Sequence, residues 1–222
     1  MKKGWKEEAR EHGREEEQAA WWKGPAKLIL ALFLLLMVVL WAVPYYSIKL
    51  NPEPTNIPSL SLIQSQFLDG VEIGNETGTD DLRLAAARIR TDDPLTRQIA
   101  AKIATESCAE SEICHAKALY YFVRDNIKYV SDPYEKEYVA SPVETLKTGG
   151  GDCDDGSLLL AALIESIGIK TRIVIVPGHA FVKALMPEAP PRYRIGEWVY
   201  MDWTCKGCEF GNIPYSDVLQ IE

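Results

Sequence analysis

The sequence predicts an α+β domain that is preceded by one N-terminal transmembrane helix. Three observations lead to this prediction. Residues 28–48 form an apolar run without any charge, and residues 81–126 place apolar side chains at the three- and four-residue spacing of amphipathic helices. Residues 170–203 contain short runs rich in β-branched and aromatic residues, which are typical of an antiparallel sheet.

The composition narrows the class of protein. The chain has 222 residues, of which 47% are apolar and 25% charged, and this balance excludes a disordered or collagen-like chain. Its 24 basic and 32 acidic residues give a net charge of −8. Because phosphate binding needs a clustered excess of Lys and Arg, we expect no nucleic-acid partner.

The apolar run at residues 28–48 has the length of a membrane span. As a helix, its 21 residues reach about 30 Å, which is the thickness of the hydrocarbon core of a bilayer. A core helix of a soluble protein would need a polar face at helical spacing, and this run has none. We therefore expect residues 28–48 to lie in the lipid bilayer.

The charges beside this run predict its orientation. Lys23 and Lys27 precede it, whereas Lys49 is the only basic residue after it before Arg83. The positive-inside rule predicts a single-pass protein of the cell membrane, with residues 1–27 as a charged cytoplasmic tail and the C-terminal part outside. A cleaved signal peptide is the alternative, but the long, Glu-rich segment before the run and the lack of a small-residue cleavage pattern disfavour it.

Residues 49–80 are expected to form a linker or stalk. They contain repeated prolines and then repeated glycines, with only short apolar stretches between them. The patterning of a packed domain begins at residue 81, so the predicted domain covers residues 81–222 and is long enough for its own core.

Helices precede strands within this domain. Apolar side chains at helical spacing predict three helices, at residues 81–89, 94–106 and 112–126. Ser141 begins a capping signature before a short helical turn. Short β-rich runs then predict strands at residues 170–176, 181–185 and 198–203, which we expect to form an antiparallel sheet.

Cys153 is the candidate nucleophile. It lies in a turn rich in Gly and Asp, at residues 149–157, that leads into an apolar helical run at residues 158–166. At a helix N-terminus, the unpaired amides and the helix dipole favour a thiolate and can receive an oxyanion. The neighbouring aspartates would raise the pKa of the thiol, so a basic partner is needed. We interpret these aspartates as helix-start residues and not as calcium ligands: Asp152, Asp154 and Asp155.

His179 is the candidate base. Of the other two histidines, His12 precedes the predicted span and His115 lies beside a cysteine on a predicted helix. His179 lies at the start of a predicted strand, where its imidazolium can stabilise the thiolate and later protonate a leaving amine. Asp202 lies on the next predicted strand and can orient that imidazole, because neighbouring antiparallel strands bring such side chains together.

The order of these residues resembles the transglutaminase-like superfamily. The matching pieces are residues 129–132, 142–146, 151–155, 168–174, 179–182 and 200–203. Together they cover roughly residues 110–205, over half of the predicted domain. The resemblance, to a membrane-anchored microbial member, implies a papain-like α+β core in which the nucleophile helix packs on an antiparallel sheet.

The resemblance also implies roles and chemistry. It makes Cys153 the nucleophile, His179 the general base and acid, and Asp202 the orienting carboxylate. The implied reaction takes an acyl group from a peptide or glutamine-type amide, through a thioester, to water or to an amine. The substrate is then a peptide or protein outside the membrane, and we expect neither a cofactor nor a metal. Ser157 stands where many members have Ala.

Two further questions stay open at the level of sequence. The same fold without catalysis would be a silent binding module on a membrane stalk. The remaining four cysteines allow disulfides within or between two pairs, a zinc site, or a redox pair in the CxxC segment. These cysteines are Cys108, Cys114, Cys205 and Cys208.

Overall fold

The computed structural model of the chain describes residue 4 and residues 24–73, 79, 81–87, 93–132 and 138–214. The chain divides into two compact units, Met1–Leu50 and Asn51–Glu222. Most of the predicted cytoplasmic tail, residues 1–27, lies outside the described residues.

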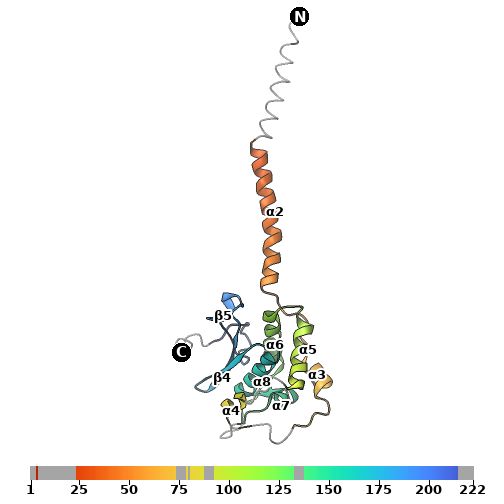
Figure 1. Cartoon of the computed structure of the whole chain (residues 1–222), viewed down its shortest axis with the longest axis vertical. Coiled ribbons are helices and arrows are strands. Elements are labelled where there is room, and N and C mark those ends of the chain that lie inside the picture. Colours follow the sequence, from red (N-terminus) through yellow and green to blue (C-terminus); the bar gives the residue numbers. More distant parts are fainter. Residues whose placement is uncertain are drawn as a thin grey trace. The chain divides into compact units, whose positions relative to one another are not determined.

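The first unit contains one long helix. Helix α2 covers Pro25–Leu50 and is drawn in orange in Figure 1. Its segment Pro25–Val43 is long and apolar enough to cross a membrane, and none of it is buried inside the protein. The helix includes the predicted span at residues 28–48 and begins earlier, at Pro25, because a proline suits the first turn of a helix.

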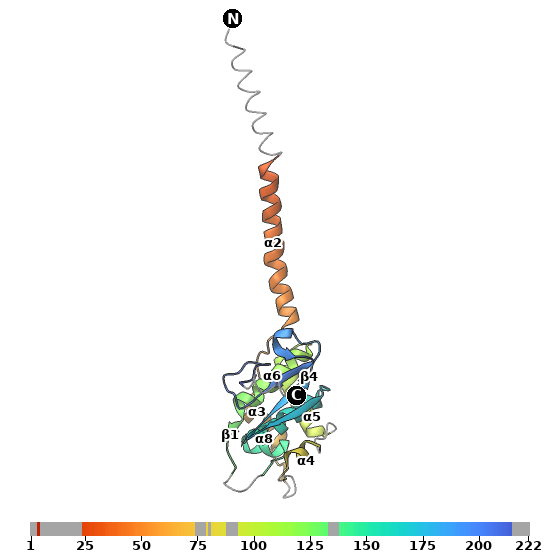
Figure 2. The same cartoon turned by 90° about the vertical axis from the view of Figure 1, so that its left-hand side faces the viewer.

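The second unit is the predicted α+β domain (Figures 1 and 2). Its helical segments are α3 (Leu60–Ile63), the π-helical η1 (Gln64–Leu68), α4 (Leu82–Ala87), α5 (Pro94–Ser107), α6 (Glu112–Asn126), α7 (Pro142–Thr148), α8 (Cys153–Ser166) and the 3₁₀ turn η2 (Pro191–Tyr193). Among the described residues, the larger sheet is antiparallel and has the strand order β3 (Thr171–Val176), β4 (His179–Leu185), β6 (Trp198–Met201) and β5 (Arg194–Ile195). A separate parallel pair joins β1 (Lys128–Tyr129) to β2 (Gly150–Gly151).

Side-chain caps explain where the long helices begin. The Asp93 carboxylate accepts a hydrogen bond from the Thr96 N–H at 2.8 Å, and α5 starts at the next residue. The Ser111 hydroxyl accepts from the Cys114 N–H at 3.3 Å, and α6 follows it. Such caps satisfy amides that have no partner within the helix. They confirm the helices predicted at residues 94–106 and 112–126.

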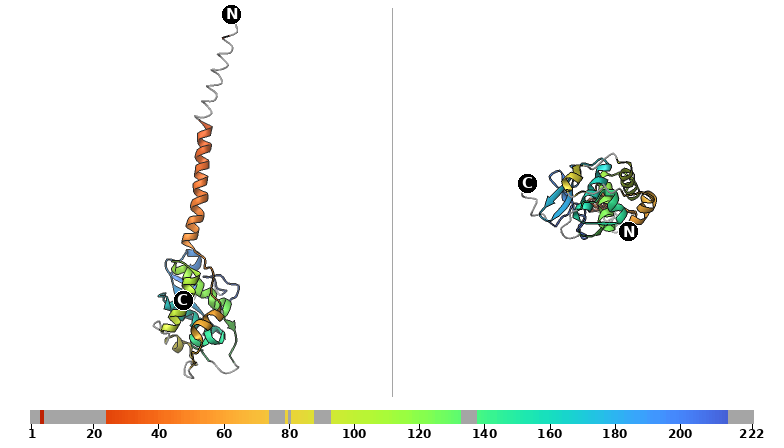
Figure 3. Two further views of the ribbon diagram at one scale, coloured as in Figure 1. Left: turned by 90° about the vertical axis from the view of Figure 1, so that its right-hand side faces the viewer. Right: turned by 90° about the horizontal axis from the view of Figure 1, so that it is seen from below.

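Helix α8 lies at the centre of the domain. Its apolar residues are fully buried, and it packs on β4 on one side and on α5 and α6 on the other. In the right-hand view of Figure 3, the blue strands and the yellow-green α5 flank the green central helices. The predicted packing of the nucleophile helix on an antiparallel sheet is therefore confirmed.

The segment expected to be a linker, residues 49–80, is partly folded onto the domain. Ile63 of α3 and Leu68 of η1 are buried in the main core. The Leu60 N–H donates to Asn126 Oδ1 at 3.0 Å, and Gln64 Nε2 donates to the Leu146 carbonyl at 2.9 Å. Apolar side chains that recur at helical spacing give this short segment enough buried surface to pack. The compact unit that contains the predicted domain begins at Asn51.

A buried lysine holds the first residues of this unit. Lys117 of α6 is only 1% exposed, and its Nζ lies 2.6 Å from Glu53 Oε1 and 2.7 Å from Asn51 Oδ1. The same ammonium lies 4.6 Å from the centre of the Tyr193 ring. A buried charge needs such partners, because burial without them costs several kcal/mol. Residues 51–53 are therefore fixed to α6.

The four remaining cysteines form two local disulfides, which settles the pairing that the sequence left open. Cys108 pairs with Cys114 across the connection between α5 and α6, and Cys205 pairs with Cys208 just after β6. Sulfurs in these bonds are not available as the four thiolates of a zinc site. Among the described cysteines, Cys153 alone is free.

Candidate active site

Cys153 is the first residue of α8, and the aspartates around it build the start of that helix. Asp152 Oδ1 accepts hydrogen bonds from the N–H groups of Asp154 and Asp155, at 2.9 and 3.3 Å. Asp155 Oδ2 accepts in return from the Asp152 N–H at 3.1 Å, which completes a capping box. The amide of Cys153 itself has no hydrogen-bond partner within the described part of the chain. That amide can receive an oxyanion.

The side chain of Asp155 is a structural anchor beneath this turn. It is 4% exposed, and its Oδ1 accepts from the Ala140 N–H at 2.7 Å. Burial raises the pKa of this carboxyl to about 6, and the charges of Asp152 and Asp132 add to the effect, while hydrogen bonds from Ala140 and Asp152 oppose it. Asp155 therefore ties the segment before α7 to the start of α8.

The sheet brings His179 and Asp202 together. His179 is the first residue of β4, and Asp202 follows the last residue of β6, the strand beside it. His179 Nε2 lies 2.9 Å from Asp202 Oδ2. The other oxygen, Oδ1, accepts from the Thr204 N–H at 3.0 Å and from the Thr204 hydroxyl at 2.7 Å. This proximity is the arrangement that the sequence predicted, while the catalytic roles of the three residues stay predictions.

Asp202 is kept ionised despite its burial. It is only 1% exposed, and burial alone would raise its pKa. Hydrogen bonds from His179 and Thr204, together with the charge of His179, outweigh burial and lower the pKa below its usual value. A carboxylate in this state can fix the Nε2–H form of the imidazole, which makes Nδ1 the basic nitrogen.

The thiol of Cys153 is half-buried and protonated in this arrangement. Burial is the largest cause that raises its pKa, to about 12; a hydrogen bond from the backbone of Ala180 opposes the rise, and the charges of Asp154 and Asp152 add to it. The thiol itself donates to Asp154 Oδ1 at 3.4 Å. Burial and two carboxylates thus favour the thiol over the thiolate and oppose the effect of the helix dipole.

One contact that was not predicted joins the helix that begins at Cys153 to the segment that carries Asp202. Trp203, next to Asp202, is fully buried, and its Nε1 donates to the Cys153 carbonyl at 3.3 Å. Its indole lies against Gly156, where an added Cβ would come within 2.1 Å of the ring. Only glycine leaves room for this contact. A glycine inside the first turn of an apolar helix was the one available signal.

Tyr129 is a second residue near the site for which no role was predicted. It is half-exposed on β1, and its ring centre lies 6.2 Å from that of Trp203. Burial raises the pKa of its phenol, and the charge of Cys153 is the next cause. Tyr129 therefore lies close enough to Cys153 for the charge of the sulfur to act on its phenol.

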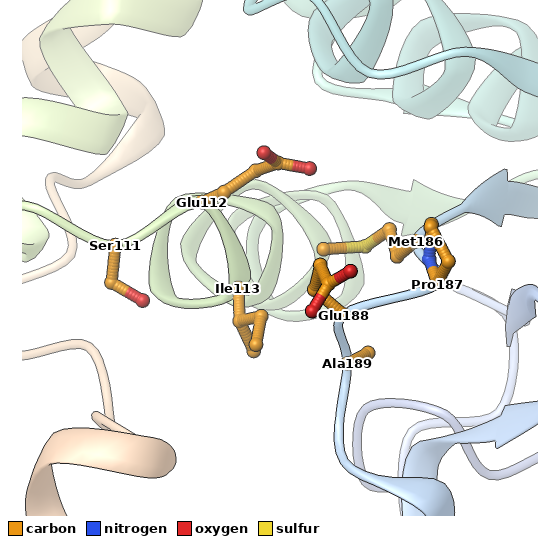
Figure 4. A pocket seen from close by; sticks show the side chains of 7 residues that line it. All are labelled: Ser111, Glu112, Ile113, Met186, Pro187, Glu188 and Ala189. Carbon is orange, nitrogen blue, oxygen red and sulfur yellow. The ribbon is translucent and has the colours of Figure 1, made fainter.

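Two other features of the described residues could hold a ligand. Ligand atoms of Asp152, Cys153 and Asp154 lie within 4.8 Å of one another, but Asp152 already caps α8. A hollow of about 260 Å³ lies between residues 111–113 at the start of α6 and residues 186–189 after β4 (Figure 4). Since His179 opens β4 and Leu185 closes it, this hollow lies at the opposite end of the strand from the histidine.

Comparison with known proteins agrees with this geometry. Residues 97–203 match the family model described as the transglutaminase-like superfamily. The matched range contains Cys153, His179 and Asp202. A search of curated proteins found no match to the chain. Residues 97–203 of this chain therefore form a domain of the transglutaminase-like superfamily.

Proposed function

We propose that the protein is a membrane-anchored thiol enzyme that takes acyl groups from peptide or glutamine-type amides and passes them to water or to an amine. The observation that supports this most is the 2.9 Å contact between His179 Nε2 and Asp202 Oδ2, beside a helix that begins at Cys153. A transglutaminase-like domain around these residues agrees with cysteine-based chemistry.

In the proposed reaction, His179 acts as a general base. Because the pKa of the Cys153 thiol is raised to about 12, little thiolate exists at neutral pH before the substrate binds. The proton must therefore leave the sulfur as the sulfur attacks. With Nε2 directed to Asp202, the nitrogen that receives this proton is Nδ1 of His179.

The bonds then change in two stages. Cys153 Sγ bonds to the amide carbonyl carbon while its proton passes to His179 Nδ1, and the amide N–H of Cys153 stabilises the oxyanion. The carbon–nitrogen bond breaks as the imidazolium gives its proton to the leaving amine, or to ammonia from a glutamine side chain. A thioester remains, and water or a second amine attacks its carbonyl carbon while His179 takes a proton from the attacking group. The carbon–sulfur bond then breaks, and the imidazolium returns that proton to Cys153 Sγ, which restores the thiol.

Membrane anchoring is the second part of the proposal. Helix α2 is long and apolar enough to span a bilayer, and Lys23 and Lys27 near its N-terminus favour a cytoplasmic N-terminus. The two disulfides of the domain fit an oxidising compartment outside the membrane. A membrane-impermeant amine reagent applied to intact cells should label lysines of the domain and spare those of residues 1–27.

The test of activity uses the full-length protein in detergent micelles with a glutamine-containing peptide, with and without a primary amine. We expect ammonia release in both cases, incorporation of the amine in the second, and loss of both in Cys153→Ala. Mass spectrometry distinguishes deamidation, amine transfer and cleavage of the peptide.

A second function is favoured by the raised pKa of the thiol, which suits a silent binding module. That function would be supported if no product forms and Cys153 reacts with an alkylating reagent no faster than free cysteine at neutral pH. The enzyme would instead be supported if Cys153 is alkylated faster than free cysteine and His179→Ala removes this advantage, because a silent module has no need of a base.

A further inference from the structure

Strand β4 extends beyond its neighbour β6 at the site. The two strands pair from Val182 with Met201 to Leu185 with Trp198, and β6 ends at Met201. On its other edge, Ala180 pairs with Ile175 of β3. Within the described part of the chain, no strand therefore lies beside Ala180 on the β6 side. Peptide groups at such an edge need other partners, because Ala180 is fully buried.

The N-terminal half of α8 supplies those partners. Ser157 Oγ donates to the Ala180 carbonyl at 3.1 Å, and both residues are fully buried. The N–H of Ala180 forms a hydrogen bond with the sulfur of Cys153. Cys153 and Ser157 are four residues apart, so they share one face of the helix. Two side chains of α8 thus take the place of the missing strand.

We propose that Ser157 is a positioning residue: its hydroxyl holds Ala180, and with it His179, against the helix turn that carries the Cys153 thiol. This inference rests on the proposed function. Without the hydroxyl, the segment that bears the base is joined to α8 by packing and by the weaker N–H to sulfur contact alone. The separation between base and thiol then becomes less well defined, and proton transfer depends steeply on that separation.

A second serine on the same helix separates positioning from general stability. Ser166 is also buried, and its hydroxyl donates to the Ala162 carbonyl at 2.7 Å. That bond stays within α8, whereas the bond of Ser157 reaches β4. Both serine-to-alanine variants lose one buried hydrogen bond from a hydroxyl to a carbonyl. Only Ser157→Ala should affect the thiol.

The test measures the alkylation of Cys153 by uncharged iodoacetamide between pH 6 and pH 10, on the full-length protein in detergent micelles. The other four cysteines are disulfide-bonded, and peptide mass spectrometry reads the modified residue directly. We expect Ser157→Ala to lower the rate at pH 8 about tenfold, the equivalent of one hydrogen bond, and to move the rise of the profile to higher pH. Ser166→Ala should keep the wild-type profile.

A Ser157→Ala profile that coincides with that of Ser166→Ala would overturn the inference. If Ser157→Ala does not fold, Ser157→Cys keeps a side chain of similar shape with a weaker hydrogen-bond donor. We expect this variant to lower the alkylation rate of Cys153 at pH 8 about threefold. An unchanged rate would equally overturn the inference. Wild-type turnover of the glutamine peptide separates the two proposals. If wild type turns over the peptide but the alkylation profiles of Ser157→Ala and Ser166→Ala coincide, only the role of Ser157 is wrong. If the Ser157→Ala profile is shifted but wild type shows no turnover, only the proposed activity is wrong.

Discussion

Asp155 and Asp202 are two buried aspartates on opposite sides of one site, and their pKa values move in opposite directions. Asp155, on the helix side, has a pKa raised to about 6 by burial and by neighbouring carboxylates. Asp202, on the strand side, has a lowered pKa because His179 and Thr204 outweigh the effect of burial. Equal burial therefore does not fix the charge of a side chain; the donors and charges around it do.

This difference gives the two carboxyl groups different tasks. Among the described residues, Asp155 accepts from the backbone amides of Ala140 and Asp152 alone, so it serves to hold chain segments together. Asp202 accepts from an imidazole, so its charge acts on a group that can exchange protons. The strand side of the site thus supplies the fixed negative charge, and the helix side supplies a neutral thiol.

The largest expected effect comes from removing the charge on the strand side. Asp202→Asn should lower kcat/KM for the glutamine peptide about 10²- to 10⁴-fold, because His179 loses the carboxylate that fixes its Nε2–H form. Thr204→Val removes only one hydrogen bond to Asp202 Oδ1 and should have a far smaller effect. An Asp202→Asn enzyme within tenfold of wild type would show that Asp202 does not orient the base.

The next effect tests the contact that joins the two sides. In Gly156→Ala, the new methyl group would overlap the indole of Trp203, so we expect a loss of about 1–3 kcal/mol in the free energy of unfolding. Cys153 alkylation should also change, because Trp203 Nε1 bonds to its carbonyl. Gly207→Ala is the matched control, since an added Cβ there meets no neighbour. Urea unfolding measures the free energy of unfolding of both variants. Equal losses in Gly156→Ala and Gly207→Ala would contradict the packing of Trp203 on Gly156.

Asp155→Asn tests the helix side through stability. The amide cannot accept from both N–H groups, so we expect a loss of about 1–3 kcal/mol at pH 4.5. Because the pKa of about 6 in the folded protein exceeds that of the unfolded chain, the contribution of Asp155 is fully present below about pH 4 and lost as the pH rises through 6. The difference in the free energy of unfolding between wild type and Asp155→Asn should therefore be smaller at pH 7 than at pH 4.5. A difference that stays constant between pH 4.5 and pH 7 would contradict the raised pKa.

The smallest expected effect concerns the thiol. Asp154→Asn removes a carboxylate that accepts from Cys153 Sγ and raises its pKa, so alkylation at pH 7 should become about three- to tenfold faster. Glu188→Gln changes the net charge equally but lies beside the distant hollow, so it should leave the rate unchanged. A slower reaction in Asp154→Asn would mean that Asp154 helps to activate the thiol.

Features encoded by neighbouring residues could be predicted from the sequence. The cap Ser111 and the apolar spacing after it gave α6 its observed limits, residues 112–126. The β-rich runs gave the antiparallel strands, and their adjacency brought His179 to Asp202. The predicted runs became β3, β4 and β6, whereas the two-residue β5 between β4 and β6 was not predicted and lies at the edge of the sheet, so it does not separate them.

Features that depend on distant parts of the chain could not be predicted. The proline-rich segment before residue 81 reads as a linker until Ile63 is seen in the core, and Lys117 looks like a surface residue until Glu53 is placed beside it. The sequence shows both the helix start and the aspartates beside Cys153, but it does not show how deeply the thiol is buried, and burial is the largest cause of its raised pKa. Desolvation is a property of the assembled site.

Under the proposed function, the contact between Trp203 and Cys153 gives the reaction an optical signal. The indole is buried, its N–H donates a hydrogen bond to the Cys153 carbonyl, and the Lys206 ammonium lies 5.0 Å from the centre of its ring. Indole emission responds to the nearby electric field, so acylation of the sulfur, which removes the thiol proton, should change the Trp203 signal. Formation and decay of the thioester could then be followed in real time with an unlabelled substrate.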